Sequence, residues 1–128
     1  MTGKYGPAAI AAVNLVRENV TNNPRNAWEI ALSKYYEKNS DGWKKGCPKE
    51  TFLGICSEEL IKGISRGHYT DSKKNKAYGV TAIEMLKKNS NLAENKAELW
   101  RQIPNRSAKN QNGQLDVVIA LWNEGMIR

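Results

Sequence analysis

The segment GHYTDSKKNKAYG, from Gly67 to Gly79, concentrates side chains that could bind an anion. Lysine ammonium groups bind phosphates as point charges, and tyrosines stack on bases or donate hydrogen bonds to phosphates. Three lysines follow Ser72, a residue type that caps helix starts. Cations in a first turn oppose the helix dipole at a cost of about 0.3–1 kcal/mol each, and a bound anion would offset that cost. The candidate residues of this surface are Arg66, Tyr69, Lys73, Lys74 and Lys76.

The charge distribution favours the same region. The 128 residues carry a formal net charge of +7, and residues 65–90 hold six lysines and arginines against two acidic residues. More than half of the excess charge therefore lies in this stretch. A local field of this sign favours a polyanion, either nucleic acid or an acidic protein surface. A linker with a well-solvated helix start is the alternative that the sequence leaves open.

A second basic stretch, DGWKKGCPKE, runs from Asp41 to Glu50. Here Trp43 precedes Lys44 and Lys45, a pairing that can bind a base or an acidic partner. A tryptophan that covers the edge of the core is the more common arrangement, and both interpretations stay open. The stretch is not a phosphate-binding loop, because the pattern G-x-x-x-x-G-K-[ST] is absent.

The sequence predicts no catalytic centre and no metal or cofactor site. Cys47, Cys56 and His68 supply only three candidate zinc ligands, and their spacing matches no zinc pattern. Cys56 falls on the apolar face of a predicted helix and is expected to be buried. Cys47 lies among lysines that would lower its pKa, so it should be the faster of the two thiols to react. The carboxylates are scattered and form no acid–base pair, and we therefore predict that the chain is not an enzyme.

The length and the cysteine count constrain the setting. A chain of 128 residues is predicted to form one domain with its own core. Two cysteines are too few for a disulfide framework and fit a reducing compartment. The apolar run AAIAAVNLV follows Pro7 and lacks a cleavage site, so it is not interpreted as a signal peptide. No run approaches the 18 apolar residues of a membrane span. We expect a cytoplasmic protein without membrane contact, and its oligomeric state stays open.

The hydrophobic periodicity predicts an all-α fold of six helices, because no run alternates as a strand would. The last helix shows the clearest amphipathic pattern, at Leu115, Val118, Ile119 and Trp122. Gly125 should then end that helix in a left-handed cap, with Met126 folded onto the core. The predicted helices begin at Pro7, at Asn23-Pro24, at Pro48 and after Ser72, and continue with a short helix around Trp100 that stops at Pro104 and the last helix from Leu115.

The two halves of the chain are similar in sequence. Tyr5-Gly6 and the apolar residues after it match Tyr78-Gly79 at an offset of 73, and Trp28 matches Trp100 at 72. FLGICSEELI, residues 52–61, matches VIALWNEGMI, residues 118–127, at 66. The offset changes only where loops are expected. We predict a compact bundle of two similar three-helix halves, about residues 1–64 and 73–128, joined by a basic linker.

The segments KKGCP, FLGIC, YTDSKKNKAYG and NGQLDVVIALWNEGMI resemble an uncharacterised family of small bacterial proteins of unknown function. The resemblance covers most of the chain; it implies a bacterial or phage setting and no known activity. The three-helix halves also loosely resemble helix-turn-helix modules. That likeness is weak, because the last helix would expose an acidic and amide set that is ill-suited to a DNA groove: Gln114, Asp116, Asn123 and Glu124.

Two hypotheses follow from these observations. The chain is either a small helical nucleic-acid-binding accessory protein or a protein-interaction module that docks an acidic partner. Both would use the surface from Arg66 to Tyr78, with Trp43, Lys44 and Lys45 as a second contact.

Overall fold

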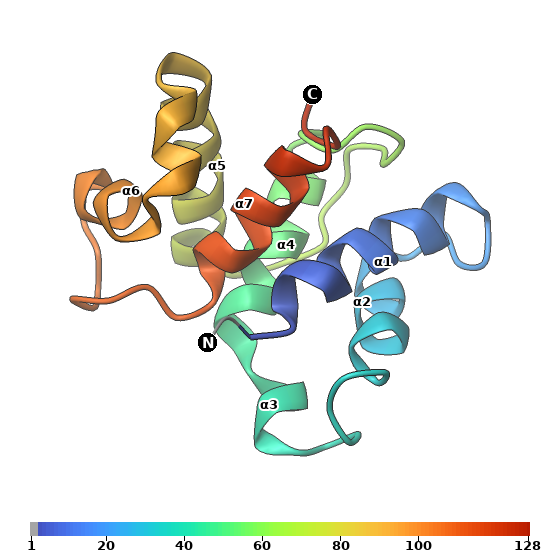
Figure 1. The fold of residues 1–128 in the computed structure, drawn as a ribbon. Coiled ribbons are helices and arrows are strands. Elements are labelled where there is room, and N and C mark those ends of the chain that lie inside the picture. Colours follow the sequence, from blue (N-terminus) through green and yellow to red (C-terminus); the bar gives the residue numbers. More distant parts are fainter. Residues whose placement is uncertain (1–2) are drawn as a thin grey trace.

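The computed structural model describes residues 3–128, and these residues confirm the all-α prediction (Figure 1). The first half of the chain forms α1, α2, the single-turn α3 and α4. The second half forms α5, a short 3-10 helix η1, α6 and α7. The bounds are α1 Tyr5–Arg17, α2 Pro24–Leu32, α3 Asp41–Lys44, α4 Gly46–Ser57, α5 Lys73–Lys88, η1 Ser90–Glu94, α6 Lys96–Gln102 and α7 Gln114–Asn123.

Three helix starts test the use of proline as a start signal. Pro24 is the first residue of α2, and the Asn23 side chain accepts a hydrogen bond from the backbone N–H of Arg25 at 2.9 Å, as predicted. Pro7 and Pro48, however, are each the third residue of their helix rather than the first. A helix leaves its first N–H groups without intrahelical partners, so a proline fits anywhere in the first turn. The predicted starts of α1 and α4 were therefore two residues late.

The short elements α3 and η1 were not predicted. The Ser40 side chain caps α3 by accepting a hydrogen bond from the N–H of Trp43 at 3.3 Å. Asn89 caps η1 in the same way, through the N–H of Asn91 at 3.2 Å. Both elements are too short to show hydrophobic periodicity, and only their polar caps could have revealed them.

Two helices, α4 and α7, pack against each other at the centre of the fold. Figure 1 shows α7 crossing in front of α4, with α1 and α2 on one side and α5 and α6 on the other. α1 packs against α7, and α5 packs against α4. The first helix of each half therefore contacts the last helix of the other half. Trp28 and Phe52 are fully buried with ring centroids 5.3 Å apart, and Tyr78 meets Trp100 edge-on at 5.1 Å.

The buried face of α7 differs from the predicted stripe. Leu115 and Val118 are fully buried, but Ile119 and Trp122 are only half-buried. Val117 and Leu121 are fully buried and complete the face. The reason is that α7 contacts α1, α4 and α5 together, so its apolar contacts extend around the helix beyond a single stripe.

The ends of α4 and α7 have the same backbone arrangement. Glu59 and Gly125 both adopt left-handed conformations, with φ of 59° and 72°, and Met126 is buried, as predicted for the second cap. After each of these residues, a backbone N–H donates to the carbonyl five residues earlier. The N–H of Leu60 donates to the carbonyl of Ile55 at 3.1 Å, and the N–H of Met126 donates to the carbonyl of Leu121 at 3.0 Å.

The residues after these caps pair with each other. Ile61 and Ile127, which match at the offset of 66, form an isolated antiparallel bridge. The N–H of Lys62 donates to the carbonyl of Met126 at 2.8 Å, and the N–H of Arg128 donates to the carbonyl of Leu60 at 2.9 Å. This exchange has local twofold character. Superposition of the complete halves as similar three-helix units stays a prediction.

Candidate polyanion-binding site

Polar contacts hold the start of α5 and thereby fix the backbone position of its first lysines. The Ser72 side chain accepts hydrogen bonds from the backbone N–H of Asn75 at 3.3 Å and from its side-chain amide at 3.1 Å. Asn75 is buried, and its side-chain oxygen accepts from Nε2 of Gln114 on α7 at 3.3 Å. Ser72 is thus the predicted cap, and Lys73 and Lys74 follow it as exposed residues.

A groove of about 400 Å³ lies between α5 and the chain that follows α6. Lys73 and Lys74 stand along it, and Thr81, about two turns further along α5, adds a hydroxyl. The other residues of the lining are Ala77, Tyr78, Ile103, Pro104 and Asn105. Sequence reasoning used Pro104 only as a helix stop and missed Thr81 and Asn105, because no local pattern joins residues that lie 24 positions apart.

The far wall of this groove is anchored by Tyr78. Its hydroxyl accepts a hydrogen bond from the N–H of Ser107 at 2.9 Å and lies 3.3 Å from the carbonyl oxygen of Asn105, to which it can donate. Arg106 caps the end of α6, because its guanidinium donates to the carbonyls of Trp100 at 3.1 Å and Ile103 at 3.2 Å. These bonds hold the loop after α6 against α5.

The predicted lysines differ in their ion pairs. Within residues 3–128, Lys73 and Lys74 make no ion pair, whereas Nζ of Lys76 lies 2.7 Å from Oε2 of Glu58. Arg66 also lies near acidic side chains, at 3.7 Å from Glu58 and 3.9 Å from Glu59. The Lys76 hydrogen bond and its charge, with a smaller contribution from Arg66, lower the pKa of Glu58 below its ordinary value. The structure therefore separates the predicted cations into two with carboxylate partners and two without.

Tyr69 is engaged with the protein. Its hydroxyl donates to the carbonyl of Ser65 at 2.8 Å, and its N–H donates to Oγ of Ser57 at 3.0 Å. Partial burial raises the pKa of Tyr69 above its ordinary value. The ring packs against the core cluster, so it is poorly placed to stack on a base.

The second predicted contact lies elsewhere on the molecule. Trp43 packs against the core cluster, and its Nε1–H donates to Oγ of Ser33 at 3.0 Å. Nζ of Lys45 lies 5.4 Å from the centroid of the Tyr5 ring, and Lys44 is exposed. Figure 1 shows α3 at the bottom of the view, away from the loop of residues 60–72. The two predicted basic stretches therefore belong to different elements, α3 with the residue after it, Lys45, on one hand and the linker with the start of α5 on the other.

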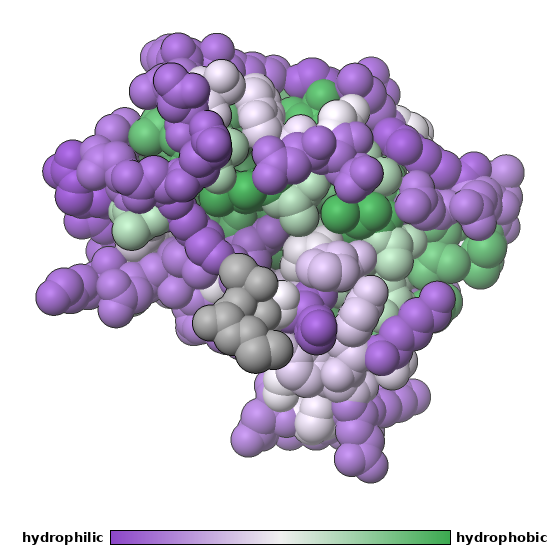
Figure 2. Space-filling view, viewed as in Figure 1, coloured by the Kyte–Doolittle hydropathy of each residue, from purple (hydrophilic) through white to green (hydrophobic). Residues whose placement is uncertain are grey.

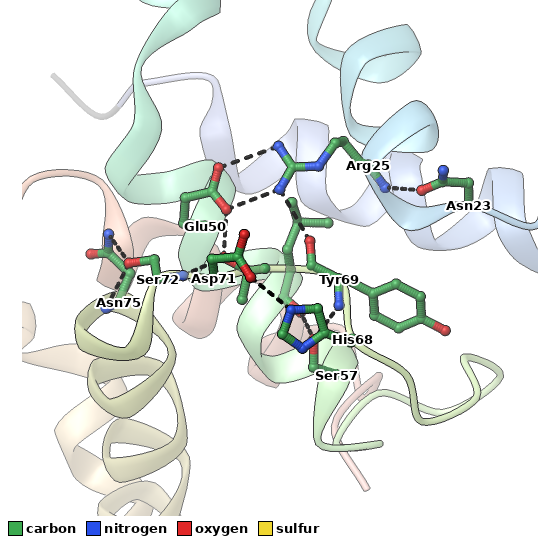
Figure 3. A network of polar contacts seen from close by, with 11 residues as sticks. Asn23, Arg25, Glu50, Ser57, His68, Tyr69, Asp71, Ser72 and Asn75 are labelled. Atoms are coloured by element: carbon green, nitrogen blue, oxygen red, sulfur yellow. Dashed lines mark hydrogen bonds and ion pairs between the residues drawn. The ribbon is translucent and has the colours of Figure 1, made fainter.

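The linker before α5 is held by a polar network that the sequence did not predict (Figure 3). Arg25 of α2 forms an ion pair with Glu50 of α4 at 3.2 Å. Thr70 donates to the same carboxylate at 2.5 Å, and His68 pairs with Asp71 at the surface at 2.7 Å. The contacts join residues 25, 50 and 70, so no local sequence pattern could have revealed them.

The two cysteines lie on α4, and both are described by the structure. Cys47 and Cys56 are both free thiols; Cys56 is buried, as predicted, and burial raises its pKa. Cys47 is half-buried, and its faster reaction stays a prediction. Residues 3–128 contain no group of three or more His, Cys, Asp or Glu side chains that could hold a metal ion. None of the helices described has the length and apolarity needed to cross a bilayer.

Comparison with known proteins assigns the family. A family model described as a family of unknown function matches residues 2–128. The chain belongs to this family, DUF6979. The predicted resemblance to an uncharacterised family is thereby confirmed. No curated protein and no solved structure matches the chain.

Proposed function

We propose that this DUF6979 chain is a small basic binding protein that holds a polyanion, and specifically the phosphates of nucleic acid, at the start of α5. The single observation that carries the proposal is the pair Lys73 and Lys74. Both are exposed beside a groove, and neither has a carboxylate partner within residues 3–128. Other basic side chains of the same surface are already neutralised by glutamates.

The start of α5 suits an anion for a second reason. It is a helix of 16 residues, capped by Ser72, with no acidic residue in its first turn. The positive end of the helix dipole and the two ammonium groups would therefore act on a phosphate together. Tyr78 is buried, and Tyr69 and Trp43 are half-buried and packed against the core cluster, so these rings offer little free face for stacking on a base. The expected mode is phosphate contact with little sequence preference and a strong dependence on salt.

An acidic protein segment is the second candidate. The floor of the groove favours it, since Ala77, Ile103 and Pro104 could accept an apolar side chain that a phosphate backbone lacks. A peptide with glutamates around one leucine would then bind better than a peptide of glutamate alone. If the natural ligand is nucleic acid, the added leucine should not change the affinity of the acidic peptide.

A binding titration with matched variants tests the proposal. Fluorescence anisotropy would follow labelled duplex DNA, single-stranded DNA, RNA and the two acidic peptides with the full chain. K73Q/K74Q should bind nucleic acid clearly more weakly than the wild type. K87Q/K88Q removes the same charge from exposed lysines at the other end of α5 and should bind almost as the wild type does. Equal binding by both variants would overturn the assignment of the site.

We also propose that the protein works in a reducing compartment such as the bacterial cytoplasm. The two free thiols support this setting, because a secreted domain of this size commonly uses cysteines in disulfides. Thiol labelling of the denatured protein directly after cell lysis tests it. Two labelled thiols per chain are expected, and a disulfide would contradict the proposal.

A further inference from the structure

Two ion pairs occupy corresponding places in the two halves. Glu50 of α4 and Asp116 of α7 differ by 66 positions, the offset that also relates Ile61 to Ile127. Each carboxylate pairs with a cation that begins a neighbouring helix. Arg25 is the second residue of α2 and pairs with Glu50; Lys96 is the first residue of α6 and pairs with Asp116.

At the first pair, the chain binds its own linker (Figure 3). Thr70 donates its hydroxyl hydrogen to Oε1 of Glu50 at 2.5 Å, and Nη2 of Arg25 donates to the carbonyl of the preceding residue, Tyr69, at 3.1 Å. Thr70 is 7% exposed, and Leu53, one turn beyond Glu50 on α4, is fully buried. The ion pair thus holds the dipeptide Tyr69-Thr70 through one hydroxyl and one carbonyl.

At the second pair, the same helix face borders a groove of about 340 Å³. Lys96 and Asp116 form one part of the lining, and Ile119 stands where α4 has Leu53. Ile119 is only half-buried, unlike Leu53, and no extended segment within residues 3–128 bonds to this ion pair. The remaining apolar lining comes chiefly from Pro7, Leu115 and Ala120. On the face shown in Figure 2, apolar surface gathers along α7 and α1 among hydrophilic side chains.

We propose that this groove binds an extended segment of a separate protein that carries a threonine, in the way that the first ion pair binds Tyr69-Thr70. The threonine hydroxyl would donate to the Asp116 carboxylate, and the preceding carbonyl would accept from the Lys96 ammonium. The threonine methyl would lie against the apolar lining that includes Ile119. A neutral hydroxyl suits this position better than an anion, since the carboxylate of Asp116 would repel a negative group. The groove shares no lining residue with the one beside Lys73, so this inference stands apart from the polyanion proposal.

A peptide titration against the full chain tests the inference. The probe is a labelled, end-blocked peptide with the sequence of residues 66–72, RGHYTDS. We expect saturable binding in fluorescence anisotropy. A second peptide, with valine in place of the threonine, keeps the shape and loses the hydroxyl. It should bind at least about tenfold more weakly, because hydrogen bonds to charged groups contribute about 1.5–3 kcal/mol. This comparison uses the wild-type protein and so does not depend on a variant that folds.

Protein variants then locate the binding. D116N should weaken the binding of the threonine peptide, and the threonine and valine peptides should then bind with similar affinity. E124Q makes the same change of charge at the exposed end of α7 and should bind both peptides as the wild type does. I119R, which fills the groove, should abolish binding. K73Q/K74Q should leave peptide binding unchanged.

Three results would overturn the inference. The first is no binding of the threonine peptide to the wild type, and the second is equal affinity for the threonine and valine peptides. The third is a dimer of the wild type in sedimentation that D116N dissociates, since a second copy of the chain would then be the occupant. Failure of any of these tests would leave the polyanion titration unaffected, because the two sites differ.

Discussion

Lys74 and Lys76 lie two positions apart and have different chemistry. Lys76 points to Glu58 and forms a short ion pair, while Lys74 stands beside the groove without a carboxylate partner in residues 3–128. Because the ammonium of Lys76 is already neutralised, an anion would gain less from it than from Lys73 or Lys74. The charge count of the segment therefore overstates the charge that a ligand would meet.

The pKa of Glu58 provides a test of this distinction. We expect NMR titration to find it below the ordinary glutamate value of 4.5, because Lys76 stabilises the ionised form. A lowered pKa stabilises the fold at pH values above the unfolded pKa, and that contribution is lost as the pH falls through the folded pKa. K76Q should therefore raise the pKa of Glu58 and flatten the fall in stability below pH 4.5. An unchanged pKa in K76Q would show that the pair does not form in solution.

Sequence reasoning predicted part of the candidate site. Ser72 and the exposed Lys73 and Lys74 could be predicted, because capping and first-turn positions are local properties. The pairing of Lys76 with Glu58 could not, since it depends on how α5 lies against α4. Tyr69 and Trp43 were candidates by residue type alone, and packing directs both toward the protein.

At the scale of helices, the contact between α4 and α5 depends on two glycines. A Cβ atom at Gly54 would lie 2.6 Å from Cα of Lys76, and a Cβ atom at Gly79 would lie 2.7 Å from a side-chain carbon of Ile55. The neighbour of Gly54 is backbone, which cannot move aside without shifting the helix. This close approach sets the start of α5 and, with it, the position of Lys73 and Lys74.

Substitution of Gly54 tests that contact. G54A should destabilise the protein by about 1–3 kcal/mol, because the strain outweighs the gain in helix propensity. G46A is the matched control in the same helix, since a Cβ atom there meets nothing within 4 Å. It should be neutral or stabilising by up to about 1 kcal/mol. Urea denaturation compares the two free energies of unfolding, and equal effects would contradict the proposed contact.

The helix order was largely predictable, and the helix starts less so. Apolar spacing predicted the long helices because their buried faces repeat with the helical period. Pro7 and Pro48 misplaced two starts, because proline is tolerated throughout a first turn. The ion pairs at the starts of α2 and α6 join residues that are far apart in the sequence, so no local sequence pattern could predict them.

At the scale of the whole molecule, the two halves cross over each other. α1 packs on α7 and α5 packs on α4, and the tails after α4 and α7 pair through Ile61 and Ile127. We predict that neither half is stable alone, because its first helix would lose the packing contact with the last helix of the other half. Within this arrangement, the Lys73–Lys74 groove and the Lys96–Asp116 groove share no lining residue.

The salt dependence of duplex DNA binding tests the central claim most directly. Each phosphate contact adds about −0.9 to the slope of log K against log salt. The loss of two contacts in K73Q/K74Q should therefore flatten the slope by about 1.8. Stability should hold or rise slightly, since the removed charges oppose the dipole of α5. K87Q/K88Q should keep the wild-type slope. A slope that is unchanged in K73Q/K74Q, or flattened equally in both variants, would contradict the account.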